Sequence, residues 1–143
     1  MKETPAVRSV LDKMELTGVD FCLDIHGDEE IPFIFIASVD RLLPLPPDTT
    51  RTLDLFEDLL GREDPNFLRH PFLDREHIKM SPQSFCVPHL MQRFDIPAVT
   101  LELPFKQYSA HTSSKRDFGA AECVQSGRIM VDVLLRFLSG WGR

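Results

Sequence analysis

Three short apolar segments, at residues 19–26, 31–37 and 96–103, constrain the fold more than any other feature of this sequence. The first alternates strictly, which is typical of a β-strand with one buried face. Its polar positions are Asp20, Cys22, Asp24 and His26. The second is almost wholly apolar, as in strands buried on both faces. The third ends at Pro104. The sequence therefore predicts three short strands.

Helical patterns surround these strands. A helix is predicted over residues 5–17, with a Thr4-Pro5 start and Gly18 after its end. A second begins at Asp48 or Thr49 and stops at Gly61. Residues 62–80 have no sustained period and are expected to be irregular.

Two further helices are predicted in the second half of the chain. One opens at Ser81-Pro82, and Pro88 is expected to kink or interrupt it. A loop follows from Lys106 to Phe118, and the last helix covers residues 119–138. Its apolar stripe is predicted to comprise Val124, Val131, Leu134, Leu135 and Leu138. Strands separated by helices favour a single α/β domain with a mixed, largely parallel sheet and flanking helices.

Composition excludes several classes of function. The chain has 143 residues, of which 43% are hydrophobic, and its net charge is −6 without a basic cluster. Nucleic acid is therefore not an expected partner. No apolar stretch is long enough to span a membrane, and the N-terminus lacks a secretory pattern, so we expect a cytoplasmic protein. The three cysteines share no metal-ligand spacing.

The first candidate site lies where the first strand ends, at His26 and Gly27. In open α/β sheets, ligands bind at the carboxyl ends of strands. Asp24 shares a face with His26 and is the candidate carboxylate that orients the imidazole ring. Glu29 follows His26 at a spacing that can supply two zinc ligands. A polar turn with a solvated strand-end histidine is the alternative.

The second candidate site is Glu102, near the end of the third strand. An unpaired carboxylate on an apolar strand is costly to bury. Glu102 is therefore either a solvated edge residue or an acid with a cationic or metal-bound partner, in which case it is a candidate general base. Together, His26 and Glu102 fit metal-assisted hydrolysis.

Two segments resemble those of a known enzyme family. The run from Gly18 to Glu29, continued by Pro32–Ala37, and the later run Thr100–Lys106 are similar, in the same order, to segments of the zinc metallocarboxypeptidases. The likeness is greatest to the cytosolic carboxypeptidase branch and its bacterial relatives. It extends over nearly the whole chain.

The resemblance implies an α/β sandwich that binds one zinc ion. It assigns His26 to the third zinc ligand and Glu102 to the general base, and it implies the C-terminus of a peptide or protein as substrate. The family's His-x-x-Glu ligand pair and its substrate-binding arginine lie upstream of the third ligand by far more than the 25 residues available here. Neither carries over, and the substrate-binding residues of this chain stay unknown.

We therefore expect residues 1–143 to be the C-terminal portion of such a domain, either a truncated product or half of a split protein. Its partners would be a peptide or protein C-terminus and the missing N-terminal half, which would supply the further zinc ligands. Activity of this chain alone is not expected. The alternatives are a non-catalytic, degenerate α/β module and an aspartoacylase-like amidohydrolase of the same broad superfamily.

Overall fold

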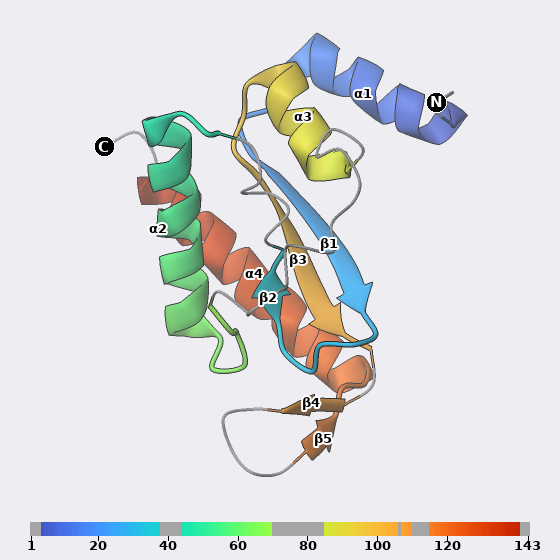
Figure 1. Cartoon of the computed structure of the whole chain (residues 1–143), viewed down its shortest axis with the longest axis vertical. Helices are drawn as coiled ribbons and strands as arrows, with labels where there is room; N and C mark the ends of the chain where they lie inside the picture. The colour runs from blue at the N-terminus through green and yellow to red at the C-terminus, as the bar shows by residue number, and fades with distance from the viewer. Residues whose placement is uncertain (1–3, 38–43, 70–84, 106, 110–114, 141–143) are drawn as a thin grey trace.

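The structure is a computed structural model that describes residues 4–37, 44–69, 85–105, 107–109 and 115–140. These residues form four helices and five strands, arranged as in Figure 1. In chain order the elements are α1 (Pro5–Thr17), β1 (Cys22–Asp28), β2 (Phe35–Ile36), α2 (Pro47–Glu63), α3 (Cys86–Phe94), β3 (Ala98–Pro104), β4 (Gln107–Ser109), β5 (Lys115–Asp117) and α4 (Ala120–Gly140).

The main sheet is three-stranded and mixed, with the order β1-β3-β2. β1 runs parallel to β3, and β2 runs antiparallel to it. In Figure 1, α4 crosses behind the strands beside α2, while α3 lies near the beginning of β3. The predicted α/β architecture with flanking helices is confirmed, although the second apolar segment pairs antiparallel.

An aromatic cluster holds the sheet against α2 and α4. The Phe21 ring lies 5.1 Å from Phe56 and 4.8 Å from Phe137, centroid to centroid, and Phe56 and Phe137 meet edge to face at 5.4 Å. Such tilted contacts are favourable because the positive edge of one ring faces the negative face of another. Phe56 and Phe137 are both fully buried. The cluster therefore joins α2 and α4 to the residue that precedes β1, although the three positions are distant in the sequence.

The first predicted helix has the predicted boundaries. The Thr4 side chain accepts a hydrogen bond from the Val7 amide at 3.4 Å, and Pro5 begins α1. Gly18 follows with a φ of +73°, which a residue with a side chain adopts only under strain. Only Leu11 of this helix is buried. The local sequence signals therefore predict both ends of α1 correctly, although most of its apolar residues are exposed.

Two predictions about the helices need correction. α2 continues through Gly61 to Glu63, because burial of Leu60 outweighs the roughly 1 kcal/mol that glycine costs inside a helix. Pro88 does not interrupt α3: it occupies the first turn, where the missing amide hydrogen has no helical acceptor to lose. The proposed start at residues 81–82 lies outside the described residues.

The predicted apolar stripe of the last helix is wrong. The residues of α4 that face the core are Ser126, Met130, Val133 and Phe137. By contrast, Val124, Val131, Leu135 and Leu138 are more than half exposed, and only Leu134 of the predicted set packs partly against the core. α4 thus carries apolar residues on two faces, and the predicted stripe is mostly the outer one.

The strands also differ in detail from the prediction. β1 extends two residues beyond His26, since Gly27 and Asp28 pair with Leu103 and Pro104. The second apolar segment is buried from Ile34 to Ala37, but only two of its residues form a strand. The loop expected over residues 106–118 contains two short strands, β4 and β5, which pair antiparallel. No helix in the described part of the chain is long and apolar enough to cross a membrane.

Candidate functional site

The parallel pairing of β1 with β3 places His26 directly opposite Glu102. Asp24 lies opposite Thr100, two residues earlier on each strand. Paired residues of neighbouring strands project to the same face, and residues two apart on one strand do so as well. Asp24, His26 and Glu102 therefore share one face of the sheet. The two strands bring together the candidate residues that the sequence places 76 positions apart.

Both nitrogens of the His26 ring have a carboxylate nearby. Nε2 lies 3.1 Å from Oδ2 of Asp24, and Nδ1 lies 3.9 Å from Oε1 of Glu102. The His26 side chain is 51% exposed, whereas the Glu102 side chain is only 15% exposed. The imidazole is thus oriented between two acids and remains accessible from outside.

Glu102 is held in an electrostatically unfavourable position. Its Oε2 atom is buried and has no hydrogen-bond partner. Burial raises the pKa of this carboxyl above its usual 4.5; His26 opposes the shift, and the nearby acids Asp28, Asp24 and Glu29 add to it. A buried oxygen without a partner and a raised pKa are both features of catalytic carboxylates.

The raised pKa predicts the effect of neutralising Glu102 on stability. The folded state binds more protons than the unfolded state in the window just above pH 4.5, so the free energy of unfolding falls as the pH rises through the folded-state pKa. Glu102→Gln removes this charge. We expect it to raise the free energy of unfolding by about 1 kcal/mol at pH 7, with little gain below pH 4, where the glutamate is protonated in both states.

Urea unfolding of both proteins at pH 4 and pH 7 measures this difference. Glu63→Gln is the matched control, because Glu63 lies at the surface of α2 and contacts Arg136. A Glu102→Gln protein that is less stable than the parent at pH 7 would show that the carboxylate is stabilising where it stands.

Gly27 lies inside β1, although the strand was predicted to end at His26. The ring of Phe105 lies over it. A Cβ atom at position 27 would lie 2.5 Å or less from two ring carbons of Phe105. The Phe105 amide also donates to the Asp28 carbonyl at 3.0 Å. The glycine therefore lets the segment after β3 close over the end of β1.

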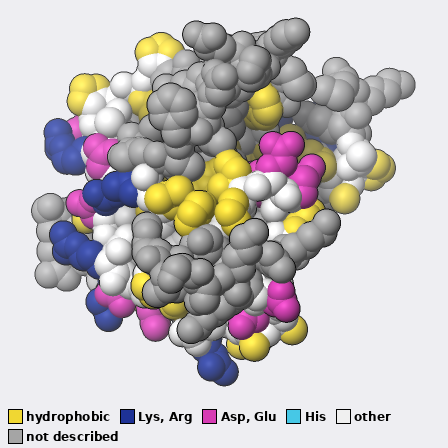
Figure 2. Space-filling model, turned by 60° about the horizontal axis from the view of Figure 1, so that its bottom comes forward, with side chains coloured by type: hydrophobic (Ala, Val, Ile, Leu, Met, Phe, Trp, Pro, Cys, Tyr) yellow, Lys and Arg dark blue, Asp and Glu magenta, His cyan; other side chains and the backbone are white. Residues whose placement is uncertain are grey.

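An acidic cavity of about 340 Å³ lies beyond the ends of the two strands. Its lining residues are Asp28, Glu29, Glu30, Ile31, Pro32, Pro104, Phe105 and Asp117. Figure 2 shows a group of acidic side chains beside an apolar patch on one face of the molecule. Asp28 also shapes the turn, since its carboxylate accepts from the Glu30 and Ile31 amides.

The described residues do not supply a complete set of metal ligands. Among the described residues, no group of three or more His, Cys, Asp or Glu side chains is arranged to hold a metal ion. His26 and Glu29 do not form part of such a group, although their spacing suggested one. The oriented His26 ring, with the unpartnered Glu102 oxygen nearby, fits one side of a metal centre, and the described residues do not supply the remaining ligands.

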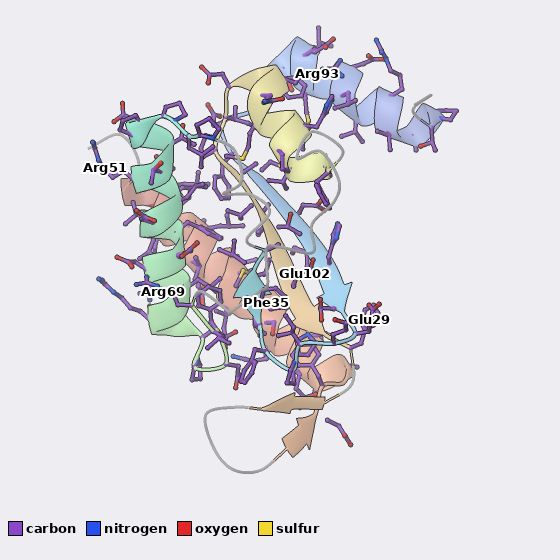
Figure 3. The ribbon with its side chains drawn as sticks, viewed as in Figure 1. Glu29, Phe35, Arg51, Arg69, Arg93 and Glu102 are labelled. Carbon is purple, nitrogen blue, oxygen red and sulfur yellow. The ribbon has the colours of Figure 1, made fainter. Side chains whose placement is uncertain are left out.

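None of the arginines labelled in Figure 3 lies beside Glu102. Each contacts a carboxylate elsewhere: Arg51 that of Asp48, Arg69 that of Asp58, and Arg93 that of Glu15. These three side chains support the helices rather than the site.

Comparison with known proteins identifies the fold. No protein-family model matches the chain. An uncharacterised protein of Zymomonas mobilis is 27% identical over 137 residues, which are 96% of this chain and 36% of that protein. A metallo-carboxypeptidase from Pseudomonas aeruginosa, solved in complex with (2-guanidinoethylmercapto)succinic acid, is 26% identical with a TM-score of 0.81 and matches 96% of this chain. A metallo-carboxypeptidase from Burkholderia cenocepacia is 22% identical with a TM-score of 0.79 and also matches 96%.

In each case this chain spans only about a third of the other protein, 35% or 36% of its length. The structural likeness nonetheless extends over almost all of the described architecture. The chain therefore has the fold of part of a metallo-carboxypeptidase domain.

Proposed function

We propose that this chain is the C-terminal part of a zinc-dependent metallocarboxypeptidase, which releases C-terminal amino acids from peptides or proteins. The observation that carries the proposal is the alignment of His26 with Glu102 on one face of adjacent strands, where a buried carboxylate oxygen has no partner. The fold of the metallo-carboxypeptidases in the comparison supports it. None of the three cysteines, all of which lie among the described residues, forms a disulfide bond, as is usual for proteins of the reducing cytoplasm.

His26 is the residue of this chain that would hold zinc. Asp24 lies beside Nε2 and favours the tautomer with its proton there, which leaves the lone pair of Nδ1 available. Nδ1 is also the nitrogen on the side of Glu102. Zinc, when bound, acts as a Lewis acid that polarises a carbonyl and lowers the pKa of water. Asp24 would fix the ring orientation.

Glu102 would act as the general base. Its buried oxygen can accept a proton from water, and its raised pKa makes it a better acceptor than an ordinary surface glutamate. After accepting the proton, the carboxyl group can pass it to the amine that leaves. Burial is the largest cause of the raised Glu102 pKa, and a charge on the neighbouring His26 would oppose it.

The remaining parts of the site would come from outside this chain. The comparison proteins are almost three times as long as the matched segment, which leaves room for further zinc ligands and for the group that binds the substrate carboxylate. Affinity for zinc depends on several ligands being held in place together. The chain alone is therefore proposed to be inactive.

The test is to restore the missing part. The unmatched portion of the Zymomonas relative would be joined ahead of this chain, and release of C-terminal residues from a peptide library would be followed by mass spectrometry with and without a zinc chelator. We expect chelator-sensitive release by the joined protein and none by the chain alone. A folded, zinc-loaded joined protein without peptidase activity would refute the proposal.

The same assay separates the alternatives. Adding acylated amino acids to the substrates distinguishes an aspartoacylase-like amidohydrolase, which would cleave these and leave peptides intact. A joined protein that binds no zinc and cleaves neither class would instead be a non-catalytic module. Neither alternative has an observation in its favour comparable to the His26–Glu102 pair.

A further inference from the structure

A second cavity, of about 200 Å³, lies between the segment that follows α2 and the first half of α4. The two helices run in opposite directions in Figure 1, which brings the end of α2 toward the beginning of α4. This cavity shares no lining residue with the acidic cavity beyond β1 and β3. Polar and apolar side chains both contribute to its wall, among them Asp64, Asn66, Phe118, Gln125, Ser126 and Ile129.

The carboxyl group of Asp64 is the most unusual part of this wall. Only 1% of the residue is exposed, and its Oδ2 atom is buried without a hydrogen-bond partner. An ionised carboxylate that is buried without a partner is strongly destabilising. A water molecule could donate a hydrogen bond to this oxygen, but it would leave the negative charge uncompensated. The oxygen therefore marks a place for a positively charged donor.

The turn after α2 accounts only for the other oxygen of Asp64. Oδ1 accepts a hydrogen bond from the Asn66 amide at 2.8 Å, and the Asp64 carbonyl accepts one from the Phe67 amide at 3.1 Å. An asparagine at position 64 would make the same turn, because its side-chain oxygen can accept the same bond. The turn therefore does not explain why this position carries a carboxylate.

The described residues supply no positive charge to this cavity. No described lysine or arginine lines it. Two arginines of the adjoining segments contact other carboxylates: Arg69 that of Asp58, and Arg136 that of Glu63. Glu122 adds a second carboxylate to the lining. The site is therefore suited to a cation from outside the described residues.

The composition of the wall suits a primary ammonium group. An ammonium group has one positive charge and three hydrogen-bond donors. Asp64 offers the opposite charge, and the Ser126 hydroxyl and the Gln125 side-chain carbonyl are further acceptors on the same wall. Ser126 is also almost fully buried. Phe118 and Ile129 provide apolar surface for the short carbon chain that would carry the ammonium group.

A metal ion fits this cavity less well. The described part of the chain contains no group of three or more His, Cys, Asp or Glu side chains arranged to hold one. A hard cation such as Ca²⁺ takes about six to eight oxygen ligands. A bare ion would also leave the apolar part of the wall without a contact.

We propose that the cavity between α2 and α4 binds a primary ammonium group on a short apolar chain, with Asp64 as its counterion. A lysine side chain of another polypeptide and a free small amine share this chemistry. The cavity is separate from the His26–Glu102 pair, so the inference does not depend on the proposed peptidase function.

Calorimetric titration of the whole chain with n-butylammonium tests the proposal. We expect saturable binding with a Kd of about 1 mM or less, which is reasonable for a ligand of so few atoms. In NMR spectra of the same titration, the amides of Gln125 and Ser126 should shift, whereas those of Asp24 and His26 should not. The neutral analogue n-butanol has the same size and should not bind. Nα-acetyl-lysine amide presents the ammonium group as a protein side chain does.

Asp64→Asn removes the charge and keeps the turn. We expect it to weaken binding of n-butylammonium at least about tenfold, because hydrogen bonds between charged groups are the strong ones. Asp58→Asn is the matched control, since it makes the same change at a carboxylate of α2 that is 44% exposed, and its affinity should stay within about twofold of the parent. Ser126→Ala removes one acceptor and should weaken binding about fivefold. It tests the site independently if Asp64→Asn does not fold, which circular dichroism of each variant verifies.

No saturable binding by the folded chain, or equal affinities of the parent and the folded Asp64→Asn and Ser126→Ala variants, would overturn the site. Binding of n-butanol as tight as that of n-butylammonium would overturn the role of the charge. Binding of Ca²⁺ that depends on Asp64, without binding of n-butylammonium, would overturn the class of ligand. Tighter binding of Nα-acetyl-lysine amide than of n-butylammonium would support the site with a polypeptide as the source of the ammonium group, and the reverse order would support it with a free amine.

Discussion

Replacing Glu102 with glutamine in the joined protein is expected to lower the rate of peptide cleavage about a thousandfold. Glutamine preserves the size of the side chain but cannot take a proton from water, and a well-placed general base contributes roughly a hundredfold to ten thousandfold. The loss should appear mainly in kcat, because Glu102 would act on the reacting water and not on the bound peptide. Steady-state kinetics on one peptide measures both parameters.

Glu63→Gln serves as the control in the same assay, since it makes the same chemical change at the surface of α2. Its activity should stay within about twofold of the parent. A Glu102→Gln enzyme with less than a tenfold loss would exclude Glu102 as the base. The same variant is expected to be more stable than the parent at pH 7, so a misfolded site cannot explain a large loss of activity.

Replacing Phe137 with alanine is expected to lower the free energy of unfolding by about 3–5 kcal/mol, the usual range for a fully buried phenylalanine. Phe137 contacts both Phe21 and Phe56, so its removal opens a cavity where the sheet, α2 and α4 meet. Because small domains have only about 5–15 kcal/mol of stability, this loss is a large fraction of the total. Urea unfolding monitored by circular dichroism measures it.

Leu138→Ala provides the comparison at the neighbouring position, where the side chain is 52% exposed. We expect a change of no more than about 0.5 kcal/mol in the isolated chain. Equal effects at positions 137 and 138 would mean that α4 is rotated from the orientation described here.

Elements with strong local signals could be predicted from the sequence. The Thr4-Pro5 start and Gly18 define α1 through cap geometry, which depends only on neighbouring residues. The third apolar segment is confirmed as β3, and most of its residues are buried. Leu53, Phe56 and Leu60 are buried on α2 as their helical spacing predicts.

Features that depend on distant contacts could not be predicted in this way. α4 has apolar residues on two faces, and periodicity cannot tell which face meets the sheet. The buried face is the one with Phe137, because two phenylalanines from other elements complete it. The antiparallel direction of β2 likewise depends on pairing with β3, which no local signal in residues 31–37 encodes.

The candidate site also combines features that local sequence predicts with features that depend on distant contacts. Alternation along each strand predicts that Asp24 and His26 share a face. It does not predict the register with β3, which places Glu102 opposite His26. The close approach of Phe105 to Gly27 was also missed, although a glycine inside a strand is a known sign of such contacts.

The register of β1 against β3 also sets which changes in chain length this fold can accept. Shifting either strand by one residue would turn His26 or Glu102 to the side of the aromatic core. Insertions and deletions should therefore accumulate between Ala37 and Pro97 in divergent sequences, while the spacings Asp24–His26 and Thr100–Glu102 stay constant. An alignment anchored on those two spacings will recognise distant homologues that overall identity misses.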